Sequence, residues 1–229
     1  MKKLFLAGTL LLVAVAASFA QSPASTNIHQ AALKTAPTAG SGAFNELMQG
    51  NKRFVRNHMQ HPHQDTLYIH KLSTSQHPKA IVLTCADSRV SPEIVFDQGL
   101  GDLFVIRNAG NVVDNDVLGS IEYAIEHLGV TSIIVLGHEN CGAVTATVNH
   151  VNTNNHIMDL EKSISPAYAM VENKPGNKIH NTVVENVELS IKTIKNDKSL
   201  LPGNLQLNNL SIYGAVYDMA TGIVTSVGH

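Results

Sequence analysis

Hydrophobic residues follow two different spacings along the chain, and segments of the two kinds alternate. Three short runs are almost continuously apolar: 81–85 (IVLTC), 103–108 (LFVIRN) and 132–138 (SIIVLGH). Runs of this length are typical of strands that are covered on both faces, and such strands occur mainly in parallel sheets. The runs therefore predict three buried, parallel strands.

Other segments carry apolar residues at helical spacing. The clearest begins near Asp114, which can cap a helix, and ends at Gly129, a residue that commonly stops one. Its apolar face consists of Leu118, Ile121, Ile125 and Leu128. We expect further helices at 43–57, where Gly50 interrupts the pattern, at 92–96, at 141–148 and at 180–195. Residues 149–178 follow neither spacing and receive no assignment.

The end of the chain has the pattern of a hairpin. Segments 210–218 and 223–227 read as strands, with a turn at Thr221-Gly222 between them. Strands and helices alternate before this hairpin. We therefore predict an α/β fold with a mostly parallel central sheet, helices on both faces and an antiparallel extension at the C-terminus.

The first twenty residues have the plan of a secretory signal peptide, with two lysines, an apolar stretch to Ala17 and a small-residue cleavage site. We expect cleavage after Ala20 and hence a periplasmic or secreted protein. The alternative is an uncleaved anchor, although the apolar stretch is shorter than the ~20 residues of a spanning helix. Residues 21–42 predict a flexible leader, and 43–229 have the length of a single catalytic domain.

The composition of the chain bears on whether it binds nucleic acid or a membrane. The chain has 16 Lys and Arg against 18 Asp and Glu, a formal net charge of −2 at pH 7, and no basic block, so we expect no nucleic-acid partner. No segment after the signal is apolar enough to predict a membrane partner. The chain has two cysteines, Cys85 and Cys141, and in an exported protein two cysteines first suggest a disulfide.

The residues that end the predicted strands offer these cysteines another role. Ligands of parallel sheets bind beyond the carboxyl ends of the strands, and Cys85, Arg107 and His138 emerge there. Cys141 follows in the spacing H-x-x-C. Two thiolates and one imidazole suit zinc, and three protein ligands leave a fourth tetrahedral position for water or substrate. The sequence thus predicts a catalytic zinc site.

Asp87 and Arg89 follow the first of these cysteines closely. Two thiolates cancel the formal charge of zinc, so water at the fourth position is harder to ionise than at a site of three neutral imidazoles. Asp87 is therefore the candidate catalytic acceptor for a hydrogen bond from that water. Arg89 would keep the carboxylate ionised and turned away from the metal. The alternative is an ordinary surface ion pair without function.

The pattern C-x-D-x-R at 85–89, followed by H-x-x-C at 138–141, resembles the β-class carbonic anhydrases, and the resemblance covers most of residues 44–227. It implies an enzyme with one Zn²⁺ per subunit that reversibly hydrates carbon dioxide to bicarbonate and a proton by attack of a zinc-held hydroxide. It also implies an N-terminal helical arm that embraces a partner subunit, in a homodimer or homotetramer.

The resemblance further implies a substrate pocket that two subunits share. In this family a glutamine and apolar residues of a neighbouring subunit line the pocket, and Gln64 and Phe104 are the best matches here. Backbone donors near Gly142 are expected to face the substrate as well.

Three alternatives stay open at this point. The same fold could hydrolyse carbon disulfide or carbonyl sulfide. The chain could instead be a non-catalytic periplasmic protein with a Cys85–Cys141 disulfide. In a third state, Asp87 would bind the zinc at low pH after release from Arg89, leaving a closed and inactive site.

Overall fold

A computed structural model describes residues 40–228, apart from 152–153, 199 and 201–209. The predicted signal peptide 1–20 and the leader as far as residue 39 lie outside the described residues. The described residues belong to one compact unit of the chain, Pro37–His229. Within them, no helix combines the length and apolar character needed to cross a membrane.

Five strands form one sheet, in the order β2-β1-β3-β4-β5. The first four run parallel, and β5 pairs antiparallel with β4. Their bounds are β1 Ala80–Cys85, β2 Leu103–Asn108, β3 Ser132–His138, β4 Ser211–Tyr217 and β5 Val224–Val227. The predicted α/β fold, with its parallel sheet and closing antiparallel extension, is confirmed.

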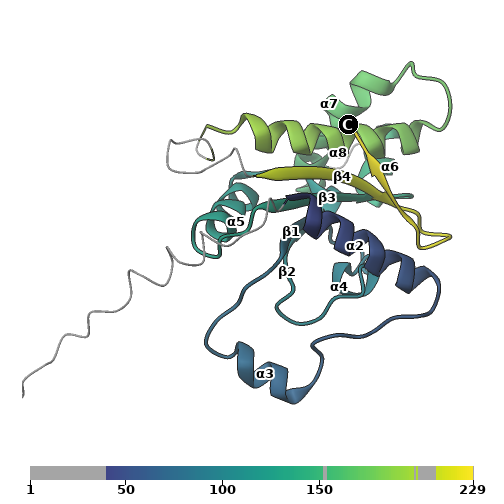
Figure 1. The fold of residues 1–229 in the computed structure, drawn as a ribbon. Coiled ribbons are helices and arrows are strands. Elements are labelled where there is room, and N and C mark those ends of the chain that lie inside the picture. Colours follow the sequence, from purple (N-terminus) through teal and green to yellow (C-terminus); the bar gives the residue numbers. More distant parts are fainter. Residues whose placement is uncertain (1–39, 152–153, 199, 201–209, 229) are drawn as a thin grey trace, which may run out of the picture. The chain divides into compact units, whose positions relative to one another are not determined.

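Helices cover both faces of this sheet (Figure 1). Alternate residues of the strands point to opposite sides, so Ile81 and Leu83 pack in one apolar cluster, whereas Ala80 and Val82 pack in the other. The first cluster includes residues of α5 Asn115–Glu126, α6 Gly142–Val148, α7 Ile157–Val171 and α8 Lys178–Asn196. The second includes residues of α2 Gly40–Val55 and α4 Pro92–Val95.

The edge strand β2 differs from the prediction of a strand buried on both faces. Its residues are only partly buried, and Arg107 is exposed. The reason is its position: β1 pairs with one edge of β2, and no described strand pairs with the other. An apolar strand edge of this kind is normally covered by another element or another chain.

The helix α2 is continuous through Gly50, where the sequence pattern predicted an interruption, and it begins at Gly40, inside the predicted leader. A Cβ atom on Gly50 would lie 1.7 Å from the carbonyl oxygen of Phe96. The glycine therefore lets α2 approach the end of α4 closely, and the buried Leu47 holds the helix on the sheet.

Two α-helices of the described residues were not predicted. The helix α7 lies in the unassigned segment 149–178 and contains Pro166, a residue that disfavours helix interiors. Its buried residues Ile164, Ala167 and Val171 pack into the core, so tertiary contacts outweigh the proline. The short helix α3 Thr66–Leu72 starts at the cap Asp65 and buries no residue, which explains its weak sequence signal.

Candidate metal centre

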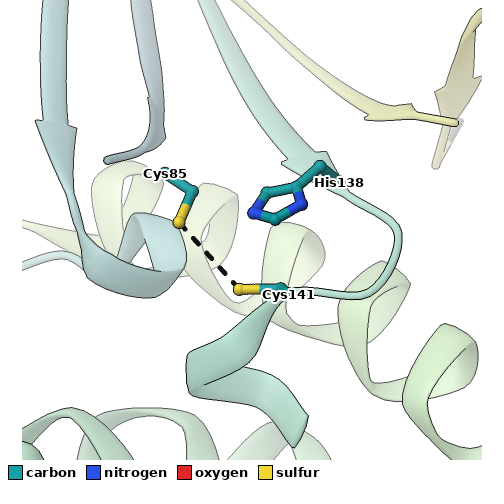
Figure 2. Close-up of side chains that lie close together, drawn as sticks. All are labelled: Cys85, His138 and Cys141. Atoms are coloured by element: carbon teal, nitrogen blue, oxygen red, sulfur yellow. Dashed lines mark hydrogen bonds between the residues drawn. The ribbon is translucent and has the colours of Figure 1, made fainter. Parts of the chain in front are cut away.

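Cys85, His138 and Cys141 meet at the carboxyl edge of the sheet (Figure 2). Cys85 is the last residue of β1, His138 is the last residue of β3, and Cys141 is the N-cap of α6. All three are buried, and their ligand atoms lie within 4.8 Å of one another. The parallel strands β1 and β3 are neighbours, and their shared direction brings the three side chains together as the sequence predicted.

The imidazole of His138 is oriented for a ligand. Its Nδ1 donates a hydrogen bond of 2.9 Å to the carbonyl oxygen of Glu139. Its Nε2 is buried and has no hydrogen-bond partner among the described residues. A buried nitrogen without a partner is costly, and a metal ion would satisfy it. This orphan atom is direct support for a metal at this point.

The two sulfur atoms have the spacing of metal ligands. They are 4.0 Å apart, and both cysteines are free. Two Zn–S bonds of about 2.3 Å at a tetrahedral angle would place the sulfurs about 3.8 Å apart, whereas a disulfide requires about 2.05 Å. The donor set and its spacing therefore fit zinc.

Neighbouring groups favour negative charge on the sulfur of Cys85. The hydrogen bond with Cys141 lowers the pKa of Cys85 to about 4 against the effect of burial, and the Gly110 amide lowers it further. The Gly110 amide nitrogen lies 3.2 Å from the Cys85 sulfur. The same shared hydrogen bond, together with burial, raises the pKa of Cys141. Without metal the pair thus retains one proton, which a divalent cation would displace.

Asp87 lies beside these three residues and forms a hydrogen-bonded ion pair with Arg89. Its Oδ1 accepts hydrogen bonds from the backbone amide and Nε of Arg89, at 3.0 and 2.9 Å, and its Oδ2 accepts one from Nη2 of Arg89 at 2.7 Å. The guanidinium thereby holds the pKa of Asp87 well below its usual range. Oδ2 is also 3.9 Å from Nε2 of His138, so the carboxylate faces the place where a metal would bind.

Arg107 supports the loop that carries these groups. It donates to the carbonyl oxygens of Cys85, Asp87 and Val90, at 3.2, 2.7 and 2.8 Å. The sequence predicted that Arg107 lies at the carboxyl ends of the strands, but it did not predict a role for this residue. Its side chain reaches backbone atoms rather than a ligand, and no residue pattern announces such contacts.

Gly110 is a second support that the sequence analysis missed. Its φ of +78° is in the left-handed region, and a Cβ atom there would lie 2.8 Å from Cδ1 of Ile164. Its carbonyl oxygen accepts from the buried Asn186 of α8 at 2.8 Å. A glycine two residues after a strand end, as in RNAG at 107–110, was the available signal.

Comparison with known proteins identifies the family. The carbonic anhydrase family model matches residues 80–224, more than half of the chain. Carbonic anhydrase 2 of Mycobacterium tuberculosis is 36% identical over 184 residues, which are 79% of this chain and 89% of the relative. The chain belongs to the carbonic anhydrase family. The carbonic anhydrase of Mycolicibacterium smegmatis is also 36% identical, over 82% of this chain and 93% of its own.

Solved structures place this carbonic anhydrase in the β class. The β-carbonic anhydrase CcaA is 28% identical with a TM-score of 0.64, over 80% of this chain and 86% of that chain. The Coccomyxa β-carbonic anhydrase, solved with acetazolamide, has the same identity and TM-score over 79% and 84% of the two chains. A tetrameric enzyme from Sordaria macrospora shares the fold, with a TM-score of 0.67 at 23% identity over 89% and 98%.

The three predicted substrate residues of this carbonic anhydrase do not all lie beside the cysteines. Gly142 is exposed at the first position of α6, directly after Cys141. Phe104 pairs with Ile81, four residues before Cys85 along β1, which is about 13 Å at 3.3 Å per residue. Gln64 is exposed in the loop before α3, next to His63, which contacts the turn that precedes β2. Gln64 and Phe104 thus lie toward the amino end of β2, away from the cysteines.

Proposed function

We propose that this protein hydrates carbon dioxide reversibly to bicarbonate and a proton, as a zinc-dependent carbonate dehydratase. The observation that carries the proposal is the buried Nε2 of His138, which lacks a described partner and faces two free cysteine sulfurs and a carboxylate. Cys85, His138 and Cys141 would hold the zinc. When bound, zinc lowers the pKa of a water at the open fourth position and so supplies a nucleophile at neutral pH.

The protein's own groups would orient that water. Asp87 would accept a hydrogen bond from the O–H of that water, because a carboxylate held by Arg89 stays ionised at neutral pH. Arg89 occupies both carboxylate oxygens and thus keeps Asp87 from closing the fourth position. Addition of the water oxygen to carbon dioxide would form one C–O bond while the π bond of one C=O opens onto its oxygen. The proton of the water would pass to buffer, which leaves bicarbonate. Backbone amides at the start of α6, beginning with Gly142, would face the bicarbonate oxygens.

We also propose that the active unit is a homo-oligomer, either a dimer or a tetramer. The free edge of β2 is apolar, and two copies related by a two-fold axis can pair these edges only in the antiparallel sense. The amino end of one β2 would then lie beside the carboxyl end of the other. This arrangement would bring Phe104 and Gln64 of one subunit toward the cysteines of its partner.

The N-terminal sequence leads to a further proposal, that the enzyme is exported. Its charged start, apolar stretch and small residues before Gln21 have the plan of a cleaved signal. Expression in a Gram-negative host should yield a periplasmic protein whose mature chain begins at Gln21. A cytoplasmic protein that retains Met1 would contradict the proposal.

Stopped-flow hydration of carbon dioxide by the mature protein, with zinc measured on the same sample, tests the function. We expect one zinc per subunit, loss of activity after chelation, recovery with added zinc, and inhibition by acetazolamide. Parallel assays with carbonyl sulfide and carbon disulfide test the rival substrates. Thiol alkylation tests the disulfide: zinc thiolates become reactive after chelation alone, whereas a disulfide also needs a reductant.

A further inference from the structure

The loop between α2 and α3, residues 56–65, is tied to the body of the protein by two buried carboxylates. Asp97 accepts hydrogen bonds from the backbone amides of Gln60 and His61, at 2.9 and 3.0 Å, and from Nε of Arg53 at 2.6 Å. Asp102 accepts a hydrogen bond of 2.8 Å from Nδ1 of His63. The first carboxylate therefore holds the loop by its backbone, and the second holds it by one side chain.

His63 adopts a backbone conformation that residues other than glycine adopt infrequently. Its φ is +55°, in the left-handed region, where the Cβ atom crowds the neighbouring backbone. Its ring stacks on that of Tyr68, with centroids 4.0 Å apart and planes 9° apart, and its carbonyl oxygen accepts from Leu100 at 3.2 Å. The surrounding contacts thus enforce a strained turn, and such turns cluster at functional sites.

Asp102 connects this turn to the start of β2. Its Oδ2 also accepts from the amide of Gly99 at 2.8 Å, and Nζ of Lys79 lies 3.4 Å from its Oδ1. The side chain of Asp102 is only 4% exposed, so its charge needs these partners. Through Asp102, the position of His63 is fixed relative to the first residues of the edge strand.

We propose that His63 is a positioning residue for Gln64 in the carbonic anhydrase reaction. The inference rests on the proposed function, in which Gln64 contacts substrate in the partner's site. Gln64 is exposed, and it follows the strained residue directly. Anchoring the turn fixes the Gln64 backbone before substrate arrives, so less conformational entropy is lost when its amide meets carbon dioxide or bicarbonate.

A double-mutant cycle tests this role on the zinc-loaded oligomer. His63→Asn removes the imidazole while asparagine tolerates the left-handed φ. We expect His63→Asn and Gln64→Ala each to lower kcat/KM for carbon dioxide about tenfold, and the double variant to be no slower than Gln64→Ala. The matched control is His61→Asn, at a second left-handed residue whose bond to Asp97 comes from its backbone amide, and it should keep wild-type kcat/KM.

Two kinetic results would overturn the proposal: wild-type kcat/KM in His63→Asn, or losses that multiply in the double variant. Hydrogen exchange gives a readout independent of catalysis. The peptide covering 58–64 should exchange several-fold faster in His63→Asn and at the wild-type rate in His61→Asn, and equal rates in all three proteins would also overturn it. If the wild-type enzyme lacked hydration activity, the proposed function would fail, while exchange would still decide whether His63 anchors the turn.

Discussion

The carboxylate of Asp87 has two competing partners within reach. One is a metal ion bound at Nε2 of His138, a nitrogen that lies 3.9 Å from Oδ2 of Asp87. The other is the guanidinium of Arg89. A carboxylate is a good zinc ligand, so an unrestrained aspartate here would close the fourth position. Two parallel N–H bonds from a planar group fix both oxygens at once, which lysine, with a single point charge, cannot reproduce.

Substitutions at this pair should therefore separate catalysis from metal binding. Asp87→Asn and Arg89→Lys should each lower kcat/KM for carbon dioxide about 10²-fold or more, with zinc content unchanged. Stopped-flow kinetics and metal analysis measure the two quantities, and Asp116→Asn on the exposed start of α5 serves as the control. Cys141→Ala should lose both zinc and activity. Wild-type turnover in Asp87→Asn would contradict the role given to this residue.

The buried carboxylate of Asp97 should make the free energy of unfolding depend on pH. Burial alone would raise its pKa, but the amides of Gln60 and His61 and the guanidinium of Arg53 outweigh burial and lower it. A carboxyl whose pKa is lower in the folded state stabilises the protein above its ordinary pKa near 4, and this contribution is lost as pH falls through the folded pKa. Asp97→Asn should thus cost about 1–3 kcal/mol at pH 7, and its deficit should shrink below pH 4. Urea titrations of both proteins across pH measure the difference; a deficit independent of pH would refute this account.

At the scale of elements, the strands were predictable because their residues are almost all apolar and their ends are polar. The bounds of β2 and β3 agree with the sequence prediction, and β1 begins one residue earlier. The same strand ends predicted that Cys85, His138 and Cys141 converge, although their roles as zinc ligands remain predictions. The helix α7 could not be predicted, because contacts of Ile164 with the core outweigh Pro166.

The connections that support the site could not be predicted either. The amide of Gly110 and the three carbonyls held by Arg107 are backbone atoms, which every residue carries, so residue types do not reveal them. Only the tertiary arrangement of β2, the turn at 109–111 and α8 brings them into contact.

Gly110 allows a test of how that turn supports the metal. In Gly110→Ala the left-handed φ should cost about 1–2 kcal/mol of folding free energy, and the displaced amide should weaken its bond to the Cys85 sulfur. We expect faster transfer of zinc to a colorimetric chelator. The control is Gly119→Ala in α5, where a Cβ atom meets nothing within 4 Å and helix propensity predicts a gain of up to about 1 kcal/mol. Equal zinc release from the two variants would contradict the argument.

For the whole molecule, the position of Gln64 and Phe104 relative to the cysteines has a direct consequence. Both lie toward the amino end of the edge strand, whereas the cysteines lie at the carboxyl edge of the sheet. If these residues contact substrate, each active site needs two subunits: one supplies the metal ligands and Asp87, and the other supplies the pocket. Activity should then depend on subunit concentration, with dissociation causing loss of hydration while zinc stays bound.

Subunit mixing tests this sharing directly. A subunit with Asp87→Asn keeps Gln64 in its 56–65 loop but lacks the carboxylate that accepts from the water. A subunit with Gln64→Ala keeps Asp87 and the metal ligands but lacks the glutamine. If the two variants are refolded or co-expressed together at equal amounts and pair at random, half of the dimers contain one subunit of each variant. Each of these mixed dimers has one active site with both Asp87 and Gln64. We therefore expect recovery to about a quarter of wild-type activity, well above either variant alone. Activity no higher than the average of the two variants would show that each subunit builds its site unaided.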